Sequence, residues 1–184
     1  NSIRDEFVDR VAKLGATARK GDPMKPDTNI GPVTTPPQYR KILDYIDIAR
    51  QEGARCILGG GPATDQPGGQ FVEPTIFVDV RPDMRIAREE VFGPVLSVIG
   101  FEDEEEAIRI ANDTIYGLAA GIWTEDIGRA MRVSKAIKAG TVWVNTYRSI
   151  SYMMPFGGRK PSGIGRESGI ESIRHYLETK STMI

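Results

Sequence analysis

Hydrophobic side chains recur at helical spacing in the first quarter of the chain. Within residues 2–19 this spacing predicts an amphipathic helix, with apolar positions at Ile3, Phe7, Val11 and Leu14. A long connection rich in proline and glycine follows. A second helix is then predicted from about Pro37 to Glu52, with an apolar face of Ile42, Leu43, Ile46 and Ala49. Gly53 is expected to end it, because glycine often lies just past a helix.

Short apolar runs typical of strands alternate with helical patterns through the middle of the chain. Strands are predicted in ARCILGGG, in QFVEPTIFVDV as a pair or a bend at Pro74, from about Val95 to Phe101, in YGLAAGIWT and in TVWVN. Helices are predicted in DEEEAIRIAND and in EDIGRAMRVSKAIKAG. This alternation predicts an α/β fold, a layered and largely parallel sheet flanked by helices. A glycine-rich basic stretch, a short helix and an extended C-terminal strand, YLETKSTMI, are expected to follow.

Composition and charge narrow the possible partners. The chain has 184 residues, of which 40% are hydrophobic and 27% charged, and its formal net charge is -1. With a pI of about 6.0 it has no basic face, so neither nucleic acid nor an anionic membrane is expected as a partner. Its apolar runs are too short for a membrane span and no leader pattern opens it, which predicts a cytoplasmic protein. One cysteine and one histidine argue against disulfides and zinc, so no metal site is assigned.

The segment EEVFGPVLSVIGF, residues 89–101, places two carboxylates and an aromatic ring before a strand that is predicted to be buried. Because an unpaired charge is costly beside apolar groups, Glu90 points to a ligand that uses its carboxylate. If the segment is extended, Glu90 and Phe92 face the same side. The carboxylate would then suit a ribose diol, and the ring would suit a nicotinamide. The alternative is that Glu89 and Glu90 are solvated and Phe92 belongs to the core.

The glycines of PFGGRKPSGIGRESG resemble a phosphate-binding loop only superficially. Their spacing, GxGxxxG, departs from the dinucleotide and P-loop patterns, and the segment before them is predicted to be a loop rather than a strand. A structural turn is the favoured interpretation. It is expected to bring three basic residues to an interface: Arg159, Lys160 and Arg166.

Three single residues are of types that can act in catalysis. Cys56 lies in a strand between Arg55 and an apolar pair, so a buried structural cysteine is favoured over a nucleophile. His175 has no acid nearby that marks a catalytic triad and is expected at a surface or an interface. Asn145, at the end of TVWVN, either donates to a developing oxyanion or caps the turn.

Four stretches in order, IAREEVFGPVLSV, NDTIYGLAAGIWTED, AGTVWVN and PFGGRKPSGIGRESG, resemble the C-terminal part of the NAD(P)-dependent aldehyde dehydrogenase family. FVDRVAKLGATARKGDP, NIGPV and GARCILGGG resemble that family as well, so the likeness covers essentially the whole chain. The resemblance implies an incomplete catalytic-type domain over residues 1–161, lacking its start. Residues 162–184 would be a tail that carries a short helix and an oligomerisation strand.

The resemblance also implies roles for individual residues. Glu90 matches the glutamate that binds the nicotinamide ribose of NAD or NADP, and Phe92 matches the aromatic that lies against the nicotinamide. The loop from Thr146 to Met154 corresponds to the one at the mouth of the aldehyde tunnel. Three residues are therefore expected to face a small-molecule aldehyde: Ile150, Tyr152 and Phe156. The tail implies a homo-oligomer assembled through its terminal strand.

One departure from the family pattern limits the chemistry. The family's catalytic cysteine lies in a Gly-Gln-x-Cys setting, and this chain contains no such motif. No catalytic residue is therefore assigned, and the chain alone is expected to be inactive as a fragment of an aldehyde-oxidising enzyme. The second hypothesis is a non-catalytic assembly or regulatory module that pairs through the terminal strand. The third is a different thiol enzyme with Cys56 as its nucleophile.

Overall fold

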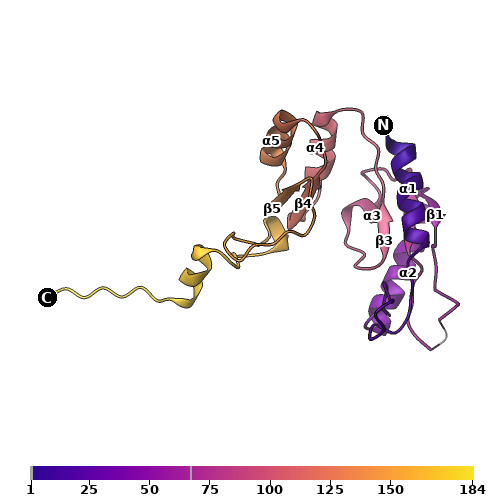
Figure 1. Ribbon diagram of the computed structural model, residues 1–184, viewed down its shortest axis with the longest axis horizontal. Coiled ribbons are helices and arrows are strands. Elements are labelled where there is room, and N and C mark those ends of the chain that lie inside the picture. The colour runs from indigo at the N-terminus through magenta and orange to yellow at the C-terminus, as the bar shows by residue number, and fades with distance from the viewer. Residues whose placement is uncertain (1, 67) are drawn as a thin grey trace. The chain divides into compact units, whose positions relative to one another are not determined.

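The computed structural model describes residues 2–66 and 68–184. It divides into two compact units, an N-terminal unit that runs to Glu102 and a C-terminal unit that begins at Asp103 (Figure 1). The N-terminal unit has the order α1-α2-β1-β2-α3-β3, and helices and strands alternate in the C-terminal unit as α4-β4-α5-β5.

Two long helices flank the sheet of the N-terminal unit. They are α1 (Arg4–Ala16) and α2 (Pro36–Gln51), and both confirm the predicted helices within a few residues. Thr35 caps α2 by accepting a hydrogen bond from the Gln38 amide, and a proline opens the helix, where no amide partner is needed. Gly53 follows its end with φ +97°, a conformation that glycine adopts without strain.

The sheet of this unit has the order β1-β2-β3, with β1 (Arg55–Leu58), β2 (Thr75–Val78) and β3 (Val95–Ser97). β1 is antiparallel to β2, and β3 is parallel to it. Side chains alternate across β2, so Phe77 lies in the core cluster with α2 while Ile76 lies near Gly15 of α1. Pro74 lies just before β2, and the strand predicted to continue to Phe101 ends at Ser97 instead.

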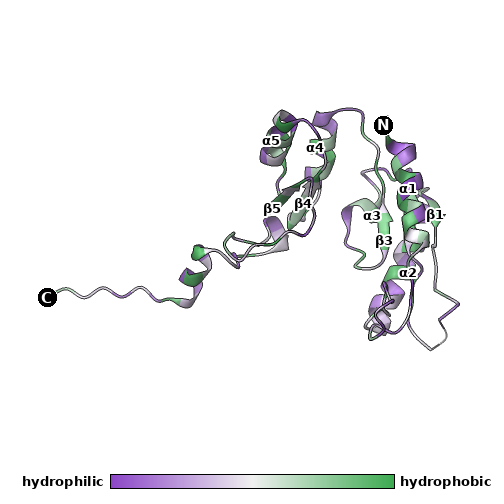
Figure 2. Ribbon diagram, viewed as in Figure 1, coloured by the Kyte–Doolittle hydropathy of each residue, from purple (hydrophilic) through white to green (hydrophobic). Residues whose placement is uncertain are grey.

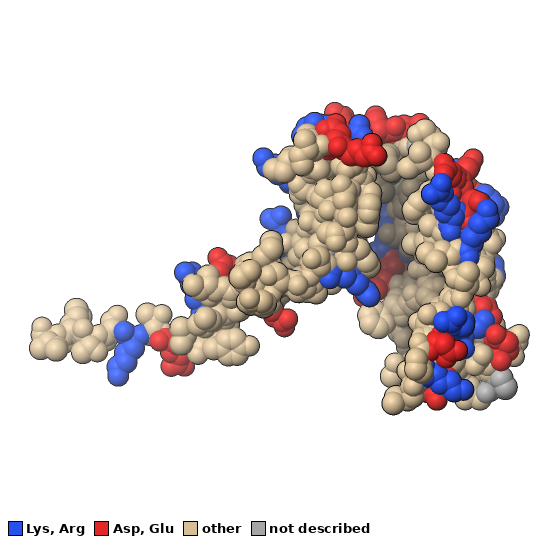
Figure 3. All heavy atoms as spheres, viewed as in Figure 1, with Lys and Arg blue, Asp and Glu red and all other residues tan. Residues whose placement is uncertain are grey.

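The C-terminal unit contains a β-α-β crossover. Its elements are α4 (Glu104–Asn112), β4 (Ala119–Ile122), α5 (Ile127–Ala136) and β5 (Thr141–Val144), and the two strands pair in parallel. Asp103 and Asp126 cap the two helices through their carboxylates. Glu104 joins the helices by ion pairs to Arg129 and Arg132 at 3.2 and 2.9 Å. Acidic and basic side chains are accordingly interspersed around α4 and α5 (Figure 3).

The end of the chain is irregular. Two short 3-10 helices, η1 (Lys160–Ser162) and η2 (Ile170–Tyr176), are followed by exposed residues 177–184 without secondary structure (Figure 1). Among the described residues, residues 177–184 pair with no strand, and Tyr176 belongs to η2 rather than to the predicted terminal strand. Leu177, Met183 and Ile184 in this end of the chain are hydrophobic and exposed. Hydrophobic and hydrophilic residues alternate along the ribbon of α1, by contrast, as in an amphipathic helix (Figure 2). No helix among the described residues is long and apolar enough to cross a membrane.

Candidate functional site

Helix α2 holds the backbone of the segment that links α3 (Arg85–Arg88) to β3. The side-chain amide of Gln38 donates to the carbonyl oxygens of Val91 and Phe92, at 2.9 Å each. One turn further along α2, Lys41 Nζ donates to the carbonyl oxygen of Glu90 at 2.8 Å. Three successive peptide carbonyls are thus tied to one helix face.

The core fixes the same segment from its other side. Val91 is buried in the cluster that contains Ile42 and Met84. A Cβ atom on Gly93 would lie 2.6 Å from Cδ1 of Ile42, so only glycine fits there without displacing the core. Between Val91 and Gly93 the chain therefore has little freedom to move.

Glu90 and Phe92 both project from this fixed backbone. Across residues 2–66 and 68–184, no group forms a hydrogen bond or an ion pair with the Glu90 carboxylate, which is exposed. Phe92 is 73% exposed, so the alternative interpretation of Phe92 as a core residue is wrong for this chain. Its φ of +55° also contradicts the premise of a regular extended segment, because such a backbone lies outside the strand region. A left-handed aromatic residue is uncommon, and here the hydrogen bonds to α2 maintain it.

Glu89, by contrast, is fully engaged. Arg85 binds it through two hydrogen bonds of 2.9 Å, and the hydroxyl of Tyr45 donates to the same carboxylate. The guanidinium of Arg85, and secondarily the Tyr45 hydroxyl, lower the pKa of Glu89 to about 2. The Glu89 hydrogen bond, and then burial, raises the pKa of Tyr45. The two adjacent glutamates therefore differ: one is neutralised within the protein, and the other is presented to solvent.

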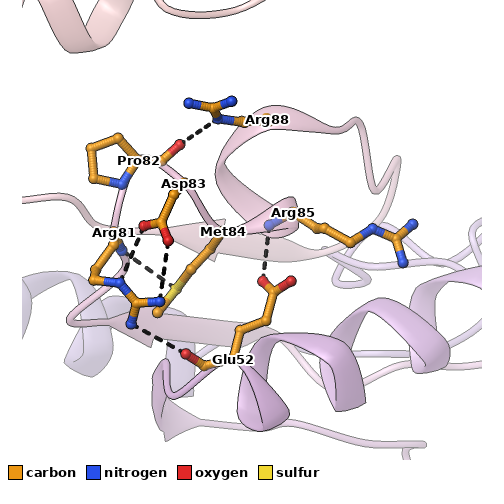
Figure 4. Close-up of polar contacts among 7 residues, drawn as sticks. All are labelled: Glu52, Arg81, Pro82, Asp83, Met84, Arg85 and Arg88. Atoms are coloured by element: carbon orange, nitrogen blue, oxygen red, sulfur yellow. Dashed lines mark hydrogen bonds and ion pairs between the residues drawn. The ribbon is translucent and has the colours of Figure 1, made fainter.

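Helix α3, which the sequence pattern did not predict, is fixed at the C-terminal end of α2. The Glu52 carboxylate accepts a hydrogen bond of 2.9 Å from the Arg85 amide, where the preceding Met84 supplies no side-chain cap. Arg81 donates to the Glu52 carbonyl oxygen at 3.2 Å, and Arg88 closes the turn by donating to the Pro82 carbonyl oxygen at 2.7 Å (Figure 4). In the sequence, the pair Pro82-Asp83 indicates only a turn before α3. The helix itself has four residues, which are too few to show a helical periodicity.

The predicted aldehyde-facing residues belong to the C-terminal unit. Ile150 and Phe156 line one pocket of about 470 Å³ beside β5. Trp143 holds the loop by donating from its indole nitrogen to the Ser149 carbonyl oxygen at 2.8 Å. Tyr152 does not line this pocket and is 82% exposed. The structure thus brings together two of the three predicted residues.

The model of the aldehyde dehydrogenase family matches residues 1–182. This chain belongs to the aldehyde dehydrogenase family. Betaine aldehyde dehydrogenase of Brucella anthropi is 48% identical over 185 residues, covering 100% of this chain and 38% of that protein. Betaine aldehyde dehydrogenase of Staphylococcus aureus, solved in complex with NAD+, has a TM-score of 0.94 at 44% identity and covers 98% of this chain.

A mutant apo form of the Staphylococcus aureus enzyme is similar as well, with a TM-score of 0.93 at 44% identity over 98% of this chain. These likenesses confirm the α/β fold and the family resemblance. The chain spans 36% of each of the two solved proteins. It therefore corresponds to well under half the length of these relatives.

In this aldehyde dehydrogenase chain, Asn145 has a structural role. Its amide oxygen accepts from the Thr124 amide at 2.9 Å, and its amide nitrogen donates to the Thr124 carbonyl oxygen at 2.8 Å. Both hydrogen-bonding groups of the side chain join the ends of β4 and β5, and the residue adopts φ +52°. Of the two interpretations left open by the sequence, the structure favours the turn cap.

Two of the three basic residues of the glycine-rich stretch, Lys160 and Arg166, contact backbone within their own unit. Arg166 donates to the carbonyl oxygens of Gly158 and Gly165, at 2.7 and 2.6 Å. Lys160 donates to the carbonyl oxygen of Thr114 at 2.8 Å. These contacts support a structural turn, and a role at an interface stays a prediction.

The single cysteine and histidine of this aldehyde dehydrogenase chain lie apart from Glu90 in the sequence and carry no catalytic arrangement. Cys56 is half-buried and its thiol donates to the Leu58 carbonyl oxygen at 3.2 Å, while Arg55 pairs with Asp79 at 2.9 Å. His175 is exposed in η2. Within the described part of the chain, no group of three histidine, cysteine or acidic residues is placed to hold a metal ion.

Proposed function

We propose that this chain is the C-terminal part of an NAD(P)-dependent aldehyde dehydrogenase whose whole polypeptide oxidises an aldehyde to a carboxylic acid. The observation that carries the proposal is the exposed Glu90 carboxylate, which has no partner among the described residues, on a backbone held by Gln38 and Lys41. The NAD+ complex of the related Staphylococcus aureus enzyme supports the choice of cofactor.

The residues present fit a nicotinamide nucleotide. Glu90 has its full hydrogen-bonding capacity available for the two hydroxyl groups of a ribose. The exposed ring of Phe92 offers a flat apolar surface two residues further on. When bound, NAD or NADP would supply the hydride acceptor. The role of this chain would be to orient the nicotinamide half of that molecule.

The covalent chemistry requires a nucleophile from outside this chain. A cysteine thiolate would add to the aldehyde to form a thiohemiacetal, and loss of hydride would leave a thioester for water to hydrolyse. Cys56 is half-buried, with its thiol hydrogen-bonded to a backbone carbonyl, and does not fit that task. We therefore expect the chain alone to be inactive.

The aldehyde would contact the loop in the C-terminal unit, through Ile150, Tyr152 and Phe156. Betaine aldehyde is the first substrate to test, because the relatives named above are betaine aldehyde dehydrogenases. In this proposal residues 1–161 form the catalytic-type domain of a cytoplasmic enzyme, and residues 162–184 form the tail that pairs copies into a homo-oligomer.

A second candidate function is a non-catalytic assembly or regulatory module. The observation in its favour is the exposed apolar end of the chain, where Leu177, Met183 and Ile184 have no cover within the structure. Such an end suits pairing with another copy.

The intact mass of the protein made by its source cell separates the two candidates. A mass well above 20.3 kDa, together with betaine-aldehyde-dependent reduction of NAD+ or NADP+, is the result expected for the dehydrogenase. A native mass of 20.3 kDa, with no turnover and a stable dimer, would overturn it in favour of the assembly module.

A further inference from the structure

One face of α2 forms hydrogen bonds with each residue from Glu89 to Phe92, the segment that presents Glu90. Gln38 and Lys41 bind its carbonyl oxygens, as described above. Tyr45, one turn after Lys41, donates a hydrogen bond to a side chain of the segment, the carboxylate of Glu89. Arg85 completes the arrangement by binding Glu89 and donating to the Tyr45 hydroxyl at 3.3 Å.

Resting on the function proposed above, we propose that Tyr45 is a positioning residue for the cofactor site and acts through Glu89 on Glu90. Glu89 lies at the exit of α3 in an extended conformation, with φ -111° and ψ 147°, and this conformation sets the direction of the chain into Glu90. The Tyr45 hydroxyl accepts from Arg85 and donates to Glu89, so the three side chains form a closed hydrogen-bonded set.

The charged groups around Tyr45 support a structural role for Glu89 and a ligand-binding role for Glu90. Arg85 offsets the charge of Glu89, so Glu89 offers no free carboxylate beside Glu90. Tyr45 has the guanidinium of Arg85 at 5.2 Å and the ammonium group of Lys41 at 5.6 Å from its ring centre. Its ring thus lies beside both cations that bind the segment, and its hydroxyl adds the link to Glu89.

Tyr45→Phe tests this role, because it removes the hydroxyl and keeps the ring beside the two cations. Tyr39→Phe is the matched control, since Tyr39 lies on the same helix, packs against the core and has no hydroxyl hydrogen bond among the described residues. In the 184-residue chain, hydrogen exchange of the stretch 86–93 should become roughly 3- to 10-fold faster in Tyr45→Phe, as expected for the net loss of one solvent-exposed hydrogen bond. Tyr39→Phe should leave that exchange unchanged.

In the native protein, Tyr45→Phe should raise the KM for NAD+ or NADP+ roughly 3- to 10-fold and leave kcat at saturating cofactor within about 2-fold. Glu89→Gln should reproduce this pattern, and it serves as the second variant if Tyr45→Phe fails to fold. Unchanged exchange, or faster exchange with an unchanged cofactor KM, would overturn the inference alone. A wild-type protein that binds neither nucleotide would overturn the proposed function, and this inference with it.

Discussion

The ammonium group of Lys41 lies 2.8 Å from the carbonyl oxygen of Glu90, across 49 positions of the sequence. Because this contact uses the backbone of Glu90, it leaves the carboxylate free for a ligand. Gln38 repeats the arrangement at Val91 and Phe92. A helix with no ligand-like feature in its sequence thus determines how the neighbouring segment is presented.

Removing the charge of Glu90 should harm cofactor binding and hydride transfer. Hydrogen bonds to a charged group contribute about 1.5–3 kcal/mol, so Glu90→Gln should lower kcat/KM for the nucleotide about 10-fold or more in the native protein. Glu125→Gln, a change at another exposed glutamate, is the control. Steady-state kinetics with varied NAD+ and NADP+ make the measurement, and unchanged kinetics would refute the role given to Glu90.

Acid should remove the stabilising contribution of Glu89. Folding lowers the pKa of Glu89 from the usual 4.5 to about 2. The ionised Glu89 carboxylate therefore stabilises the folded state above pH 4.5, and this stabilisation is lost as the pH falls toward 2. The side chain is 42% exposed, so solvent screening keeps the effect small. Urea unfolding of wild type and Glu89→Gln should show a stability difference that narrows over this range. A difference independent of pH would contradict the ion pair.

Gly93 should not tolerate a methyl group. Its Cβ would meet three side-chain atoms of buried Ile42, at 2.6, 2.7 and 3.1 Å. Overpacking of this kind costs about 1–3 kcal/mol, so Gly93→Ala should lower the free energy of unfolding by that amount. Gly61→Ala is the matched control, because nothing lies within 4 Å of its added carbon. Equal free energies of unfolding for the two variants in chemical denaturation would show that the Ile42 side chain moves aside at little cost.

Asn145 should matter for stability through its side chain rather than its backbone conformation alone. Asn145→Gly keeps access to φ +52° but loses both hydrogen bonds to Thr124, so it should cost about 1–3 kcal/mol. Asn145→Ala adds backbone strain and should cost more. Thermal unfolding of the 184-residue chain measures both. A glycine variant as stable as wild type would mean that the two hydrogen bonds contribute little.

The loop in the C-terminal unit should tune the choice of aldehyde. Ile150→Ala and Phe156→Ala enlarge the 470 Å³ pocket and should each change the KM for betaine aldehyde several-fold, on the order of 1 kcal/mol. Tyr152→Ala, a change at a residue that lies outside the pocket lining, should have a smaller effect in the native protein. Kinetics with betaine aldehyde and a smaller aldehyde compare the three. A dominant effect at Tyr152 would mean that the loop closes differently around substrate.

Local patterns predicted most helices and strands because periodicity and capping act over a few residues. α2 was predicted from its apolar face and Gly53, and the structure adds the Thr35 cap. α3 was missed, since four residues carry no periodic signal and its cap comes from Glu52. β3 is shorter than its apolar run, which shows that hydrophobicity alone does not define where hydrogen-bonded pairing ends.

By itself, the sequence determined the family, the α/β alternation of elements and the pairing of Glu90 with Phe92 as the residues of interest. Only the tertiary structure decided that Glu89 is neutralised while Glu90 remains available, and that Phe92 is exposed in a left-handed conformation. The reason is physical: Arg85 lies only four positions before Glu89, but the Tyr45 and Gln38 hydrogen bonds that complete these arrangements come from α2, 44 to 54 positions away in the chain. Such contacts follow from packing, which local residue preferences do not encode.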